Sequence, residues 1–133
     1  LNSQNTHDRS LAMAARIAAQ VKSPAEQVTH AFQVALGRVP GDRQLKIVLQ
    51  HYQKMLAHHR QHVPVKLKKP TEITREMTEE MTGEDFSWVE RLDIYAHPKY
   101  VPDLQPADVT AEVRALAEVC LVLFNSNEFI YVY

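Results

Sequence analysis

Histidine is the residue type whose spacing in this sequence could support chemistry. Seven of the 133 residues are histidines, and four of them, His51, His58, His59 and His62, fall in one amphipathic segment. His58 and His62 are four residues apart, so a helix would place both imidazoles on one face, where they could chelate a metal ion. No third ligand is evident nearby in the sequence. The alternative, which the pattern favours, is a solvated helix end whose histidines lie near the negative end of the helix dipole.

Cysteine usage bears on whether the chain could carry a cofactor of its own. The chain has no haem-attachment motif of its own, because Cys120 is its single cysteine. We therefore expect no cofactor in this chain. Cys120 falls on a predicted buried helix face, where a thiol is inert.

Acidic residues gather around Gly83, with Glu79, Glu80, Glu84 and Asp85 on either side of it. Paired carboxylates could bind calcium or take part in acid–base catalysis. The spacing lacks the alternating oxygen ligands of a calcium loop, however. We interpret the cluster as the charged, solvated tip of a hairpin.

Aromatic residues mark the same middle region as a candidate interaction surface. Phe86, Trp88, Tyr95 and Tyr100 occur close together in the sequence. Their rings could stack on a sugar or dock a protein partner. The alternative, which the sequence favours, is that the rings pack into a core against the helices. Exposure of Trp88 beside Tyr100 would favour the binding role.

Four amphipathic helices are predicted to position these groups. They are a first helix that Asn5 or Thr6 caps and that extends to about Val21, a second over residues 24–36, a third from Asp42 to about His59 or His62, and a last from Thr110 to Phe124. Ser23 and Glu26 match a capping box at the start of the second helix, which Gly37 would end. Asp42 and Thr110 are the expected caps of the third and fourth helices.

Residues 64–108 interrupt this helical pattern. Segments 73–80 and 84–92 flank Thr82 and Gly83, and Phe86, Trp88 and Glu90 alternate in the second segment, which indicates a β-hairpin or two extended arms. A helix over residues 72–81 is the main competing interpretation, because three apolar side chains there are also four apart.

The predicted fold is therefore mainly α. It is a four-helix bundle-like domain over residues 1–133, with a short β-hairpin or extended insertion at about 64–108 between helices three and four. The expected core consists of Ile17, Val28, Phe32, Leu36, Leu45, Leu49, Tyr52, Leu116, Cys120 and Phe124. The apolar tail over residues 128–133 should pack against the domain, against a partner or against both.

Composition narrows the class of protein. Hydrophobic residues make up 45% of the chain and charged residues 23%, which is typical of a folded globular domain. The formal net charge of -1 argues against a nucleic-acid partner, which would require a basic face. No apolar run is long enough to span a membrane, and no signal peptide is present. Because the chain opens at Leu1, without an initiator methionine, we expect it to be a processed protein or an excised fragment.

Two motifs carry a resemblance to a known family. Residues 35–40 (ALGRVP) pair with residues 123–129 (LFNSNEF), and residues 1–3 and 112–117 add to the match. Together they resemble the C-terminal domain of unknown function in planctomycete surface proteins that carry cytochrome-c-like domains. The likeness covers almost the whole chain and is least typical over residues 63–105. It implies that the chain is the C-terminal part of a larger exported protein in the periplasm or cell envelope, with a link to haem but no known reaction. One of the third-helix histidines or Met55 could then approach, as an axial ligand, a haem in a neighbouring domain, although nothing in the sequence requires it. A looser likeness to phycobilisome-linker-like modules suggests a scaffold.

The motif residues also have a physical interpretation. A bidentate pair between Arg38 and Glu128 would tie the turn after the second helix to the turn after the last one. Alternatively, each side chain meets water or other partners. Asn125 and Asn127 are expected to act as cap and turn residues with positive φ.

The sequence thus predicts a structural or interaction module without self-contained catalysis. It would pack against other domains of its parent or against protein partners through the aromatic insertion and the apolar tail. One alternative is an accessory domain of a haem-linked envelope oxidoreductase, directed at polysaccharide, that contributes to a site between domains. The other is a metal-binding protein that uses His58 and His62.

Overall fold

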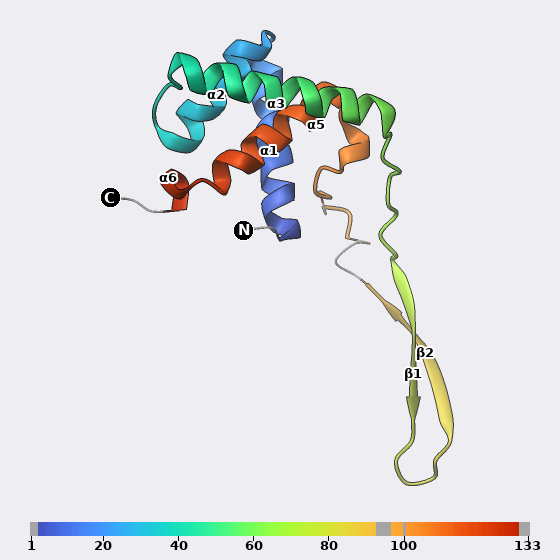
Figure 1. The fold of residues 1–133 in the computed structure, drawn as a ribbon. Helices are drawn as coiled ribbons and strands as arrows, with labels where there is room; N and C mark the ends of the chain where they lie inside the picture. Colours follow the sequence, from blue (N-terminus) through green and yellow to red (C-terminus); the bar gives the residue numbers. More distant parts are fainter. Residues whose placement is uncertain (1–2, 93–96, 100, 131–133) are drawn as a thin grey trace. The chain divides into compact units, whose positions relative to one another are not determined.

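The structure is a computed structural model that describes residues 3–92, 97–99 and 101–130 (Figure 1). Its contacts divide the chain into two compact units. The helical unit comprises residues 1–66 and 104–133, and the hairpin unit comprises residues 67–103. The chain is therefore mainly α-helical, with a small antiparallel hairpin between the third and fourth long helices, as predicted.

Within the described residues of the helical unit, the chain forms four long helices and two short ones (Figure 1). They are α1 (Gln4–Gln20), α2 (Pro24–Leu36), α3 (Asp42–Gln61), the 3-10 turn η1 (Pro106–Asp108), α5 (Ala111–Phe124) and α6 (Asn127–Ile130). Helix α5 is the central element, since it packs against α1, α2 and α3. Its apolar side chains surround most of the helix, which is why the sequence pattern there is broader than a single stripe.

The ends of these helices correct several predicted caps. Ser3 caps α1, because its hydroxyl accepts a hydrogen bond from the backbone of Thr6, so the prediction of Asn5 or Thr6 was wrong. Gly41, not Asp42, is the N-cap of α3, and the side chain of Gln44 accepts from its backbone N–H. A polar side chain within the first turn can satisfy an unpaired N–H as well as a cap can.

The start of α2 also differs from prediction. Ser23 occupies the N-cap position but makes no capping hydrogen bond with its side chain, so the capping box does not form. Pro24 is the first helical residue as predicted, and Gly37 ends the helix in the left-handed conformation, with φ 69°. The cap of α5 is confirmed, since the Thr110 hydroxyl accepts from the backbone of Val113.

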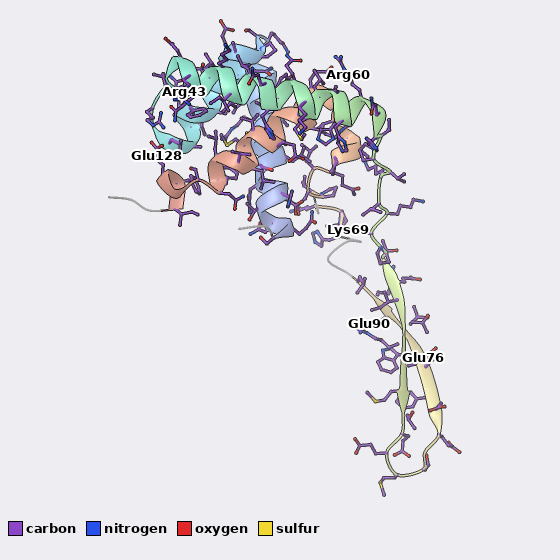
Figure 2. The ribbon with its side chains drawn as sticks, viewed as in Figure 1. Arg43, Arg60, Lys69, Glu76, Glu90 and Glu128 are labelled. Atoms are coloured by element: carbon purple, nitrogen blue, oxygen red, sulfur yellow. The ribbon has the colours of Figure 1, made fainter. Side chains whose placement is uncertain are left out.

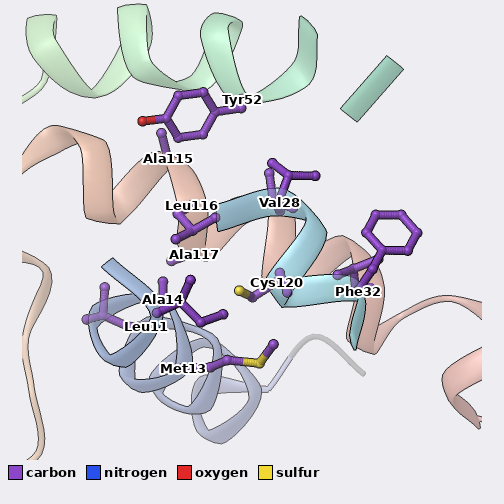
Figure 3. Close-up of a cluster of buried hydrophobic side chains, with 14 of the residues drawn as sticks. Leu11, Met13, Ala14, Val28, Phe32, Tyr52, Ala115, Leu116, Ala117 and Cys120 are labelled. Atoms are coloured by element: carbon purple, nitrogen blue, oxygen red, sulfur yellow. The ribbon is translucent and has the colours of Figure 1, made fainter. Parts of the chain in front are cut away.

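A tightly packed cluster fills the centre of the helical unit (Figure 3). Six of the predicted core residues are buried, namely Ile17, Val28, Phe32, Tyr52, Leu116 and Cys120. The other four pack against this cluster while only partly buried, namely Leu36, Leu45, Leu49 and Phe124. Ala14, Ala31 and Ala115 have no exposed surface. Small side chains at these positions let the helix backbones approach closely and leave room for larger neighbours.

The hairpin unit contains β1 (Glu72–Thr78) and β2 (Asp85–Arg91), which pair in antiparallel register. The competing helix over 72–81 is therefore wrong. Side chains of a strand alternate between its two faces, and this spacing favours the hairpin over the helix. Arg75 lies opposite Trp88 and Met77 lies opposite Phe86, so the apolar side chains of Met77, Phe86 and Trp88 share one face of the ribbon. Gly83 has φ 73° in the connecting turn, a conformation that glycine adopts without steric cost.

Among the helices in the described part of the chain, none has both the length and the apolar character that a membrane crossing requires.

Candidate functional site

An exposed aromatic pair lies on strand β2. The rings of Phe86 and Trp88 are 5.7 Å apart between centroids and stack with an interplanar angle of 24°. The two residues remain 47% and 41% exposed. Since they are two positions apart on one strand, both rings project from the same face of the hairpin.

The rest of this face comes from the paired positions of the two strands. We call it the aromatic face and define it by Ile73, Arg75, Met77, Phe86, Trp88 and Glu90. Met77, opposite Phe86, is 57% exposed. At the other end, Nε of Arg75 donates a 2.6 Å hydrogen bond to Oε2 of Glu90. An apolar centre is thus bordered by an ion pair, which is the composition of a protein-docking surface.

Phe86 and Trp88 belong to the hairpin unit, and neither is among the described side chains of the buried cluster. The alternative that these rings pack against the helices stays a prediction. The other two predicted members, Tyr95 and Tyr100, lie outside the described residues.

The acidic residues at the hairpin tip are organised as a turn. Oε2 of Glu79 accepts a 2.6 Å hydrogen bond from the backbone N–H of Thr82, and hydrogen bonding to Thr82 lowers the pKa of that carboxyl. The hydroxyl of Thr78 donates to Asp85 across the strands at 2.6 Å. Carboxylates held by the turn in this way are not arranged around a common centre. Across the described residues, no three metal-ligating side chains form a group that could hold an ion.

The histidine pair on α3 is likewise not part of such a group among the described residues. The rings of His58 and His62 stack at 4.2 Å with an interplanar angle of 23°. Nδ1 of His62 lies 2.9 Å from the carbonyl oxygen of His58, and a carbonyl can only accept, so this nitrogen donates to the last turn of α3. This arrangement matches the helix-end interpretation of the pair.

Arg38 and Glu128 form the bidentate pair that was one of two alternatives from the sequence. Nε of Arg38 donates to Oε1 at 2.5 Å, and Nη2 donates to Oε2 at 2.6 Å. Nη1 of the same guanidinium donates to the carbonyl of Val39 and to the side chain of Gln44. The hydrogen bonds from Arg38 hold the pKa of the Glu128 carboxyl below its ordinary value. This contact joins the α2–α3 turn to α6, which is a structural role; Glu128 is labelled in Figure 2.

The asparagine prediction needs correction. Asn125 ends α5 with φ -92°, and its side-chain amide donates to the carbonyl of Leu121. No residue other than glycine has positive φ in the described part of the chain. Ser126 provides the next cap: its hydroxyl donates to the carbonyl of Leu123 and accepts from the backbone of Phe129. The side chain of Asn127 is not among those described.

A small pocket lies within the helical unit, between α1, the end of α3, η1 and α5. Its volume is about 90 Å³, and its lining includes His59, Arg114 and Glu118. Nε2 of His59 is buried and lies 3.5 Å from Oε1 of Glu118, without the geometry of a hydrogen bond. Burial is the largest cause that lowers the pKa of His59 below its ordinary value, although the nearby Glu118 carboxylate raises it. The imidazole is therefore neutral in the folded protein at neutral pH.

Arg114 is the residue in this pocket that the sequence analysis missed. Only 9% of it is exposed, and its guanidinium donates to the carbonyls of Pro106, Val109 and His59. An arginine inside the apolar run of α5 was the signal that could have identified it. Because its terminal nitrogens are occupied by backbone, Arg114 holds the chain before α5 and the end of α3 in place rather than offering a site to a substrate.

The fold and these sites define a class: a small, mainly helical domain that carries a two-stranded arm with an exposed aromatic face. Comparison with protein-family models, with curated proteins and with solved structures finds no match to this chain.

Proposed function

We propose that this chain is a structural or interaction module without catalysis of its own, and that the aromatic face of the hairpin is its docking surface. The observation that carries the proposal is the stacked and exposed pair of Phe86 and Trp88. Aromatic side chains are enriched at protein interfaces, where they provide large rigid contact areas.

The instability of an isolated hairpin supports the same function. A two-stranded ribbon is marginally stable in water unless its apolar face packs against something. Here Met77, Phe86 and Trp88 leave much of that face exposed. Covering these side chains would stabilise the strands and bind the partner in one step. The partner we propose is another domain of a larger parent protein or a separate polypeptide.

Site-specific photocrosslinking in the parent organism tests this proposal. A photoreactive amino acid at position 86 or 88 of the full-length protein should give a defined crosslink to a polypeptide. Ser87 provides a matched control, because it lies between the two and projects from the opposite face. Equal crosslinking from all three positions, or from none of them, would contradict the proposal.

On the resemblance alone, we further propose that the parent is exported to the cell envelope and that a haem domain is among its neighbours. Cell fractionation tests the location. A crosslink from position 88 to a haem-bearing polypeptide would support the alternative of an accessory domain in an envelope oxidoreductase.

A further inference from the structure

The hydrogen bonds of the hairpin determine which backbone groups its strands turn outward. In an antiparallel pair, residues that exchange hydrogen bonds alternate with residues whose N–H and C=O groups point away from the partner strand. The backbone of Glu79 donates to the carbonyl of Glu84, and that of Leu92 donates to the carbonyl of Thr71. Both are pairs of the hydrogen-bonded kind, and so is every second pair between them. The residues of the aromatic face therefore point their backbone groups into the ladder.

The outer edge of β2 consequently presents backbone groups that the hairpin does not use. Asp85, Ser87 and Val89 alternate with the aromatic residues, so their N–H and C=O groups point away from β1. Within the described residues the sheet consists of β1 and β2, so no further strand pairs with this edge. No proline or glycine interrupts β2. An open edge of this kind can pair with an extended segment of another polypeptide.

The side chains of the outward-pointing residues form the second face of the hairpin. We call it the acidic face and define it by Glu72, Thr74, Glu76, Thr78, Asp85, Ser87, Val89 and Arg91. Figure 2 labels Glu76 on this face and Glu90 on the aromatic face. The strands contain two basic side chains, Arg75 and Arg91, and each pairs with a carboxylate of the opposite strand. The charges of Glu76 and Asp85 are therefore left for a partner to compensate.

One kind of partner suits both faces and the edge between them. A third strand beside β2 would pair with the free backbone groups at the edge. Alternate side chains of that strand would lie beside Phe86 and Trp88, and the others would lie beside Asp85. The first set has to be apolar and the second basic. A helix laid on the aromatic face would cover the rings but leave the backbone groups and the carboxylates without partners.

We infer that the outer edge of β2 binds, as a third and antiparallel strand, an extended segment of a partner polypeptide in which apolar and basic residues alternate. The inference rests on the proposed function and names the chemistry of the partner. Antiparallel pairing is the more stable kind per residue, and three strands are more stable than an isolated hairpin. A second hairpin does not suit this role, because residues 72–91 hold seven acidic residues and two arginines, a net charge of -5.

A synthetic peptide of alternating valine and lysine tests the chemistry of the partner. Trp88 is the only tryptophan in the chain, so its fluorescence reports binding. Addition of the peptide to the whole chain should shift the emission to shorter wavelength and reduce quenching by acrylamide, and high salt should weaken the binding. Two controls should bind at least roughly tenfold more weakly. One has the same composition with all valines before the lysines, and the other alternates valine with glutamate.

Methylation of the peptide backbone tests the strand pairing itself. In an antiparallel third strand, the residues opposite Asp85 and Ser87 share the acidic face and point their N–H groups at β2. These residues are the lysines of the peptide. N-methylation of the lysine backbone nitrogens should therefore raise the dissociation constant roughly tenfold or more, whereas N-methylation of the valine nitrogens should leave it nearly unchanged. The two methylated peptides have the same composition and charge and differ only in which edge is blocked.

The outcomes separate this inference from the function on which it rests. Failure of the alternating peptide to bind, equal binding of the rearranged peptide, or equal affinity of the two methylated peptides would overturn the strand-addition inference. The docking function is tested separately, by the crosslinks from positions 86 and 88. A crosslink from position 86 to a helical segment of a partner would retain the docking function and reject strand addition.

Discussion

Glu128, near the end of the chain, receives two hydrogen bonds from Arg38, which lies 90 positions earlier at the turn between α2 and α3. The pair closes the helical unit, because it ties α6 to a segment that precedes the hairpin. Both side chains are partly exposed, at 37% and 46%, so the pair contributes more to geometry than to the free energy of unfolding.

The first prediction concerns this pair and acid. The folded-state pKa of Glu128 lies below its ordinary value of 4.5, so the pair stabilises the protein above that pH and the contribution is lost as pH falls through the folded pKa. Glu128→Gln should lower Tm slightly at pH 7, and this difference should shrink as the pH falls below 4.5 and the wild-type carboxyl becomes protonated. Calorimetry between pH 7 and pH 3 measures the difference in Tm between the variant and the wild type. An exposed carboxyl in α2, changed by Glu26→Gln, is the control. A Tm difference that persists undiminished in acid would show that the pair is not the cause.

The second prediction concerns Arg114. Its guanidinium donates to three backbone carbonyls while almost fully buried. Arg114→Met retains most of the volume but leaves these carbonyls without donors, so we expect a loss on the order of 3 kcal/mol in the free energy of unfolding. Lysine should rescue little of this, because a single ammonium lacks the planar fork that reaches several acceptors. Urea unfolding measures the change.

Arg9→Met is the matched control for Arg114. Arg9 lies on the exposed side of α1, and its replacement should change the free energy of unfolding by less than about 0.5 kcal/mol. Similar losses in the two variants would mean that the buried hydrogen bonds of Arg114 have no special value.

The third prediction concerns pH near neutrality. Burial lowers the pKa of His59 from its ordinary value of 6.5, so the unfolded chain takes up a proton more readily than the folded one. Stability should therefore fall as pH drops below 6.5, towards the lowered folded pKa. His59→Gln should make the stability less sensitive to pH between about 5 and 7. An unchanged slope in His59→Gln would assign the dependence to other groups.

The fourth prediction concerns Cys120. The side chain is fully buried, and burial raises the pKa of its thiol to about 12. Ellman's reagent at pH 8 should therefore leave the native protein unmodified and react promptly after unfolding in urea. Cys120→Ala should cost about 1 kcal/mol, and Cys120→Ser more, because it buries an additional hydroxyl. Rapid labelling of the folded chain would show that the centre of the helical unit opens readily.

The apolar spacing of the sequence was sufficient to predict the helices and much of their interior. Val28 and Phe32 follow from the period of α2, and Cys120 follows from that of α5, because an amphipathic helix must bury one side whatever its neighbours are. The hairpin of β1 and β2 was harder to predict than the helices. In so short a segment, the same apolar residues fit both helical and strand spacing. The pairing of β1 with β2 decided in favour of strands.

The tertiary structure alone decided which polar side chains meet. The sequence allowed Arg38 to find Glu128 or water, and only the folding of α6 onto the α2–α3 turn selected the first. The backbone partners of Arg114 come from the end of α3 and the chain before α5, which only the folded helical unit brings to it. The exposure of Trp88 was likewise invisible in the sequence. Local patterns specify which face of an element is apolar, whereas the contacts of a side chain depend on residues far away in the chain, which only the assembled fold brings together.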